Sequence, residues 1–126
     1  LSSVQDSHHN RLTAAEAERL AILIEECGEV IQAVGKITRH GYDEYWISPP
    51  DNRALLTKEI GDVLFAVHLM IRAGDVSPDE LYDRFVEKSK KIVDFIHHQP
   101  CSLMESLHTE DGFHCPIDFL SEDDET

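Results

Sequence analysis

The chain has 126 residues and a formal net charge of −14, which suits one small domain and argues against a protein that binds nucleic acid, because such binding needs a basic face. No apolar run approaches the ~20 residues needed to span a bilayer, and the N-terminus lacks the basic and apolar regions of a secretory signal. Three cysteines give no disulfide framework, so we expect a cytoplasmic protein without nucleic-acid or membrane partners.

A long first helix is predicted after a polar stretch, residues 1–12, that we expect to be loose. Thr13 and Glu16 have the spacing of a capping box, in which each side chain bonds the backbone of the other residue. The apolar residues that follow are spaced by three and four, as on one side of a helix: Leu20, Leu23, Ile24, Cys27, Val30, Ile31, Val34 and Ile37. They predict a helix over residues 13–39, ending before Gly41.

Two further helices are predicted after a loop at residues 40–51. Asp51 or Asn52 caps the second, whose apolar positions recur at helical spacing until Gly74. Ser77 followed by a proline opens the third, which we expect to run from Pro78 to about His97 and to bury Leu81, Phe85, Ile92, Val93 and either Phe95 or Ile96.

From Gln99 onward the helical periodicity fades, and the last residues form an acidic tail with eight acids and no Lys or Arg after Gln99. No strand-like alternation occurs, so the fold class is all-α, with a helical-bundle domain at residues 13–98 and a C-terminal extension at residues 99–126. Three helices with broad apolar faces cannot all bury them within so short a chain. We therefore expect oligomerisation to complete the bundle.

Five acidic residues lie in two clusters inside these apolar helices: Glu25, Glu26 and Glu29 in the first, Glu59 and Asp62 in the second. Residues three or four apart share a helix face. If the two faces meet, several negative charges are crowded together, and a divalent cation with oxygen ligands, Mg²⁺ or Mn²⁺, relieves the repulsion.

The alternative is an ordinary solvated helix surface, since surface helices carry many acids. Two features favour the cation site. Gly28 and Gly61 lie between the acids, where small residues would let two helices approach closely. Lys and Arg are scarce at the spacings of a salt-bridged surface, with Lys58, four residues before Asp62, as the exception.

The segments EECGEVIQAVGKITRHG and NRALLTKEIGDVLFAVHLMI resemble the MazG-like, all-α nucleoside triphosphate pyrophosphohydrolases, whose signature is a Glu-Glu-x-x-Glu helix followed by a Glu-x-x-Asp helix. The resemblance covers roughly residues 17–96. The long connection at residues 30–58 resembles the versions found in phage and mobile-element proteins.

This resemblance implies an enzyme that uses Mg²⁺, or Mn²⁺, to hydrolyse deoxynucleoside or non-standard nucleoside triphosphates to a monophosphate and pyrophosphate, acting as a homodimer or homotetramer. Carried over by position, the metal ligands are Glu26, Glu29, Glu59 and Asp62. Glu25 matches the remaining acid, for which we expect a water-activating role, so Glu25 and Glu26 are the candidate catalytic residues.

A triphosphate also needs cationic partners. Lys36 and Arg39 lie seven and ten residues past Glu29 and can share its face. Lys88 and Lys91 are spaced by three on the third helix. All four can equally be solvated surface residues. Trp46, in the loop between the acidic helices, can stack on a base or close the bundle as an apolar plug.

Three other interpretations remain open. A ferritin-like di-iron protein would use Glu-x-x-His pairs, and none lies on the two acidic helices. A helical bundle can also serve as a binding or regulatory module whose metal is structural. A zinc site is conceivable among the C-terminal residues, although their spacing matches no familiar module: His97, His98, Cys101, His108, His114 and Cys115.

His68, on a strongly apolar helix, is interpreted as a satisfied core or interface histidine.

Overall fold

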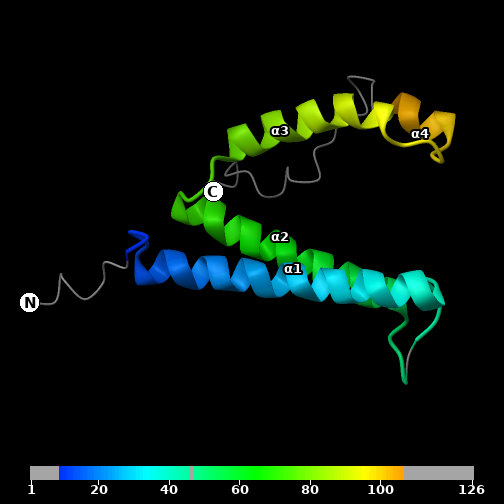
Figure 1. The fold of residues 1–126 in the computed structure, drawn as a ribbon, viewed down its shortest axis with the longest axis horizontal. Helices are drawn as coiled ribbons and strands as arrows, with labels where there is room; N and C mark the ends of the chain where they lie inside the picture. Colours follow the sequence, from blue (N-terminus) through cyan, green and yellow to red (C-terminus); the bar gives the residue numbers. More distant parts are fainter. Residues whose placement is uncertain (1–8, 46, 107–126) are drawn as a thin grey trace, which may run out of the picture. The chain divides into compact units, whose positions relative to one another are not determined.

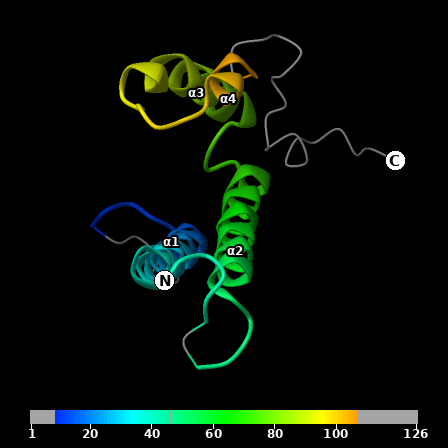
Figure 2. The same ribbon diagram turned by 90° about the vertical axis from the view of Figure 1, so that its right-hand side faces the viewer.

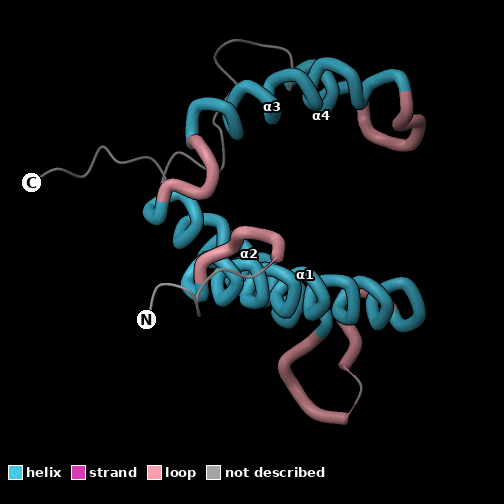
Figure 3. The backbone as a smooth tube through the Cα atoms, turned by 60° about the vertical axis from the view of Figure 1, so that its left-hand side comes forward, coloured by secondary structure: helices cyan, strands magenta, loops and turns pink. Residues whose placement is uncertain are grey.

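The computed structural model describes residues 9–45 and 47–106. Within these ranges the chain forms helices joined by loops, with no strand, which confirms the all-α class (Figures 1 and 3). The elements in chain order are α1 (Ala14–His40), α2 (Asn52–Ala73), α3 (Pro78–Lys91), the short 3₁₀ helix η1 (Ile92–Asp94) and α4 (Cys101–Ser106). The chain divides into two compact units, Leu1–Asp75 and Val76–Thr126.

Helix α1 begins at the predicted capping box. The Thr13 hydroxyl accepts a hydrogen bond from the Glu16 amide at 3.1 Å, and the Glu16 carboxylate accepts one from the Thr13 amide at 3.0 Å. These bonds satisfy donors that a helix start leaves without partners. Gly41 ends the helix with a φ of 85°, a backbone conformation that glycine adopts without strain.

The start of α2 is fixed by two neighbouring side chains. Asp51 is the cap, accepting from the Ala54 amide at 2.8 Å. Asn52 is the first helical residue and is only 4% exposed. Its side-chain amide donates to the carbonyl oxygen of Gly41 at 2.9 Å, which ties the start of α2 to the end of α1. Of the two predicted caps, Asp51 is correct, and Asn52 closes the connection instead.

Helices α1 and α2 lie side by side and run in opposite directions (Figures 1 and 2). Their core is small: Ala33 and Ala66 are each 1% exposed, and Met70 and Ile71 are also buried.

An ion pair joins the two helices at one end. Arg19, on α1, donates to both carboxylate oxygens of Asp75, just after α2, at 2.5 and 3.0 Å. Such two-point contacts between Arg and a carboxylate are geometrically specific. They therefore fix how α1 and α2 are aligned.

The expectation that Gly28 and Gly61 allow a close helix approach is wrong. A Cβ atom built on either glycine meets no atom within 4 Å. Neither glycine therefore lies where α1 and α2 touch, and the most buried residues of the two helices are Ala33 and Ala66.

Much of the predicted apolar stripe on α1 is left uncovered. Ile24 and Ile31 are 73% and 72% exposed, and Val34 is 43% exposed. The apolar residues are distributed around more than one side of α1. One neighbouring helix, α2, therefore covers only some of them.

In the second unit, the Ser77 hydroxyl caps α3 by accepting from the Glu80 amide. The α-helix ends at Lys91, and η1 continues only to Asp94, so the expected end near His97 is wrong. The backbone tightens into a turn in which the Phe95 amide donates to the Ile92 carbonyl oxygen at 2.9 Å, as helix ends commonly do. Phe95 is 75% exposed, and the expectation of a buried face is not met, because the other residues of that face are only half-buried: Leu81, Phe85, Ile92, Val93 and Ile96.

Helix α4 was not expected from the sequence. It begins where the carbonyl oxygen of Pro100 accepts hydrogen bonds from the amides of Leu103 and Met104. A helix of six residues leaves too little periodicity for a sequence pattern to reveal it. None of the described helices is long and apolar enough to cross a membrane.

Candidate metal centre

The side of α1 that packs against α2 includes one acid, Glu26. Glu26 is half-buried, as are Leu23 three residues before it and Val30 four residues after it, and Ala33 one turn further along is buried. A carboxylate at the centre of a packed helix face is costly unless it gains a partner. Helix packing therefore directs this acid toward α2.

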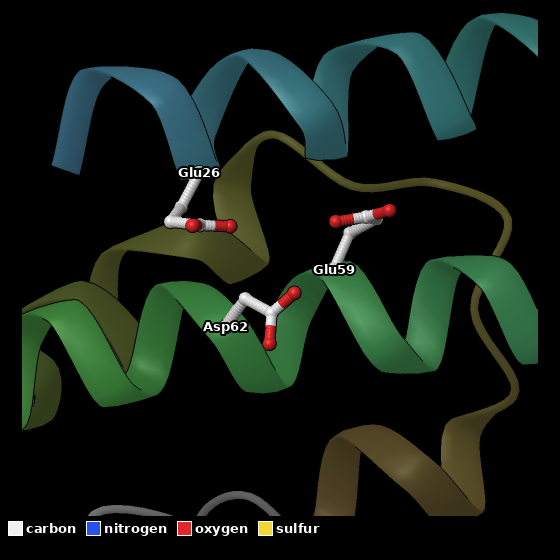
Figure 4. A group of neighbouring side chains, drawn as sticks. All are labelled: Glu26, Glu59 and Asp62. Carbon is white, nitrogen blue, oxygen red and sulfur yellow. The ribbon is translucent and has the colours of Figure 1, made fainter. Parts of the chain in front are cut away.

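Helix α2 supplies two acids that face Glu26. Glu59 is buried, with 5% of its surface exposed, and Asp62 is half-buried one turn further along. The side chains of Glu26, from α1, and Glu59, from α2, extend into the space between the two helices, and Asp62 lies beside them on α2 (Figure 4). One carboxylate oxygen from each lies within 4.8 Å of the other two. We call these three residues the carboxylate group.

The carboxylate group carries unfavourable electrostatics. Burial raises the pKa of Glu26 above its ordinary value, and the negative charges of Asp62, Glu25 and Glu59 raise it further. Both causes penalise the ionised carboxylate. Additional positive charge at this point would therefore be stabilising.

One positive side chain already contacts the carboxylate group. The Lys58 ammonium lies 3.0 Å from an Asp62 oxygen and 3.4 Å from a Glu59 oxygen. The hydrogen bond to Asp62, with the negative charges of both acids, raises the pKa of Lys58. Sequence reasoning gave Lys58 no role at the site, although its spacing of four residues from Asp62 indicated the contact.

The two remaining acids of the first cluster are placed differently. Glu25 and Glu29 are both exposed, and Glu29 does not belong to the carboxylate group. Glu25 is near enough for its charge to raise the pKa of Glu26. The structure thus brings together three of the four predicted metal ligands, and a ligand role for Glu29 stays a prediction.

The carboxylate group fits a small divalent cation. Its three donors are all carboxylate oxygens, the type that Mg²⁺ and Mn²⁺ prefer. Oxygen ligands around Mg²⁺ lie about 3–4 Å apart, given metal–oxygen distances near 2.1 Å. Oxygens already within 4.8 Å of one another need only small side-chain rotations to reach that spacing.

The predicted phosphate-binding residues of the first unit lie on α1 beyond the acids. Lys36 is half-buried, and Arg39 is exposed and donates to the carbonyl oxygen of Gly35 at 3.2 Å. Trp46 lies outside the described residues. The loop does contain an ordered aromatic contact, in which the Arg53 guanidinium lies 4.4 Å from the centre of the Tyr42 ring.

The other predicted phosphate-binding residues belong to the second unit. Lys91 forms an ion pair with Glu87 at 2.5 Å. Lys88 lines a groove of about 420 Å³ that follows one side of α3 and η1, together with Leu81, Arg84, Phe85, Ser89 and Ile92. Sequence reasoning did not foresee this groove, although its residues recur at helical spacing.

The histidine and cysteine candidates gain little support. His68 has a buried Nδ1 without a hydrogen-bond partner among the described residues, so its interpretation as a satisfied histidine is wrong for this atom. Cys101 is exposed. Within residues 9–45 and 47–106, the carboxylate group is the one cluster of potential ligands found, and His108, His114 and Cys115 lie outside the described residues.

Comparison with known proteins decides the family. The model of the MazG nucleotide pyrophosphohydrolase domain matches residues 15–93. The chain belongs to this family. The matched range contains both acidic helices of the MazG-like chain, and the family depends on a divalent metal. Neither the curated proteins nor the solved structures that were compared give a match.

Proposed function

We propose that this MazG-family protein hydrolyses nucleoside triphosphates, either deoxynucleotides or non-standard ones, to a monophosphate and pyrophosphate with Mg²⁺, which Mn²⁺ can replace. The carboxylate group is the observation that supports the proposal. It joins acids from both helices of the family signature within 4.8 Å. A packed helix face otherwise avoids such a cluster of charge.

In this proposal Glu26, Glu59 and Asp62 hold the cation, and Glu29 is a fourth ligand. Bound Mg²⁺ neutralises phosphate charge and makes a water molecule more acidic. Glu59 is the most enclosed of the three, with 5% of its surface exposed. Glu25, exposed beside the carboxylate group, is free to accept the proton of the attacking water.

The substrate contacts are proposed from charge and position. Lys36 and Arg39 extend along α1 beyond the acids, where they would bind the outer phosphates. Lys88 and Lys91 stay predicted phosphate contacts, and Trp46 stays a predicted stacking partner for the base. We also infer that the enzyme acts in the cytoplasm and does not bind nucleic acid.

We infer that the active species is a homodimer or homotetramer. The support is the uncovered apolar side of α1, where Ile24 and Ile31 are 73% and 72% exposed. These residues are seven apart and therefore share one helix face. Burying both in a second copy would remove apolar surface from water at about 25 cal/mol per Å².

The function is tested by product analysis. Purified protein is incubated with canonical and modified nucleoside triphosphates, with Mg²⁺ or with a chelator, and pyrophosphate is measured separately from orthophosphate. Pyrophosphate release that requires the metal is the expected result. Glu59→Gln and Asp62→Asn should each reduce it by roughly a hundredfold or more, since even the partners of metal ligands contribute 10–100-fold.

The exposed acid Glu18 offers a matched control, because Glu18→Gln changes the net charge equally at a position outside the carboxylate group. It should retain full activity. Tight nucleotide binding without any pyrophosphate release would instead indicate the non-catalytic binding module.

A further inference from the structure

The contact between Lys58 and the carboxylate group has a consequence for metal binding. The Lys58 ammonium lies 3.0 Å from Asp62 Oδ2 and 3.4 Å from Glu59 Oε1. Two of the three proposed metal ligands are therefore in contact with a positive charge contributed by the same helix. The third, Glu26, also experiences the field of Lys58.

The contact between Lys58 and Asp62 forms within one turn of α2. Lys58 precedes Asp62 by four residues, so the two side chains lie one above the other on the same helix face. Its side chain is 65% exposed, so most of it lies in solvent. Lys58 can therefore leave the carboxylate group by rotating about its own side-chain bonds.

A divalent cation at the carboxylate group and this ammonium draw on the same two carboxylates, Glu59 and Asp62. Mg²⁺ requires oxygen ligands at about 2.1 Å, so it would lie close to the ammonium. If Lys58 stays in place, a charge of +1 lies a few ångströms from a charge of +2. Water and salt weaken this repulsion, but at such short range they do not remove it, so the ammonium disfavours the bound cation.

We propose that Lys58 is a built-in competitor for the divalent cation, lowering the affinity of the Glu26–Glu59–Asp62 site for Mg²⁺. The inference rests on the cation site of the proposed function and adds the residue that sets its affinity. In the protein without metal, the ammonium balances part of the negative charge. On binding, Mg²⁺ must displace this ammonium or tolerate it as a neighbour, and either event weakens the observed binding.

The test is calorimetric titration of the purified full chain with Mg²⁺ and with Mn²⁺, without nucleotide. Lys58→Met should bind both cations about threefold to tenfold more tightly than the wild type, as expected for the loss of a partly screened neighbouring charge. Lys58→Arg keeps the charge and should bind within twofold of the wild type. Lys90→Met, at an exposed position of α3, controls for the change in net charge.

Thermal unfolding gives a second readout. In chelator, Lys58→Met should have a lower Tm than the wild type, because three acids lose their counter-charge. Saturating Mg²⁺ should raise its Tm by more than it raises that of the wild type. A variant that fails to fold would show itself here by losing its unfolding transition, and Lys58→Gln, which also removes the charge, would then replace it in the titration.

The outcomes separate this proposal from the proposed function. Equal or weaker cation binding by Lys58→Met, with normal binding by the wild type, overturns the role of Lys58 and leaves the metal site intact. Tighter binding by Lys90→Met to the same extent also overturns it, because the effect would then come from net charge alone. Absence of binding in the wild type and in every Lys58 variant would refute the metal site itself, and the Lys58 proposal with it.

Discussion

At the scale of single residues, tertiary packing separates acids that the sequence pattern treats as equivalent. The spacing predicted that Glu26 and Glu29 share a face, and on a helix they lie about 60° apart. That difference leaves Glu26 half-buried and Glu29 exposed. Sequence periodicity could therefore predict the two acidic clusters. It could not predict which acid of the first cluster faces α2, because that depends on how the two helices pack.

The raised pKa of Glu26 predicts how stability without metal depends on pH. A carboxyl group with a raised pKa binds its proton more tightly in the folded state than in the unfolded chain. The folded state therefore gains stability as the pH falls through the raised value, and the gain is complete below the ordinary value of 4.5. Melting curves in chelator between pH 7 and pH 4.5 should show this gain in Tm for the wild type.

Glu26→Gln removes the titrating group and should flatten that part of the profile. Identical pH profiles for the wild type and Glu26→Gln would contradict the raised pKa of Glu26.

The Arg19–Asp75 pair has the opposite pH dependence. The hydrogen bonds from Arg19 lower the pKa of Asp75, so the pair stabilises the fold above the ordinary value of 3.8. This stability is lost as the pH falls through the lowered pKa. Asp75→Asn should reduce the Tm at pH 7, with the difference from the wild type shrinking in acid.

The exposed residue Asp83 supplies the control, and Asp83→Asn should leave the Tm almost unchanged. An equal loss in both variants would show that the Arg19–Asp75 pair contributes nothing specific.

At the scale of helices, the starts were predictable and one end was not. At Thr13, Asp51 and Ser77, the cap side chain accepts a hydrogen bond from the backbone amide three residues later. Both partners are close in the sequence, so these helix starts can be predicted from the sequence alone. The end of α3 has no glycine to mark it. Lys91 is followed by Ile92 and Val93, which continue the apolar pattern while the backbone tightens into η1.

Gly61 allows a test at the helix scale. It lies within α2 with no atom within 4 Å of an added Cβ, so Gly61→Ala should stabilise the protein by about 0.5–1 kcal/mol through helix propensity alone. Denaturant unfolding measures this change. A loss of stability would mean that another copy of the chain contacts this position, since nothing within the described chain does.

At the scale of the whole molecule, the structure leaves apolar surface that the sequence predicted would need a partner. Sedimentation should show a dimer or tetramer at micromolar concentration. Ile24→Glu combined with Ile31→Glu, at positions exposed in the single chain, should yield a smaller species without loss of helical circular dichroism. The matched control is Tyr45→Glu, at a residue 52% exposed in the connecting loop. A wild type that sediments as a folded monomer would contradict the inference.

The measurement that tests the central claim most directly is hydrolysis of a nucleoside triphosphate in ¹⁸O-labelled water with Mg²⁺. Attack by water on the linkage between the α and β phosphates must place the label in the monophosphate or in pyrophosphate. Phosphorus NMR or mass spectrometry of the first products detects it, and Asp62→Asn should form neither labelled product at a comparable rate. Labelled orthophosphate appearing first, together with a nucleoside diphosphate, would contradict the assigned reaction even if the carboxylate group binds the metal.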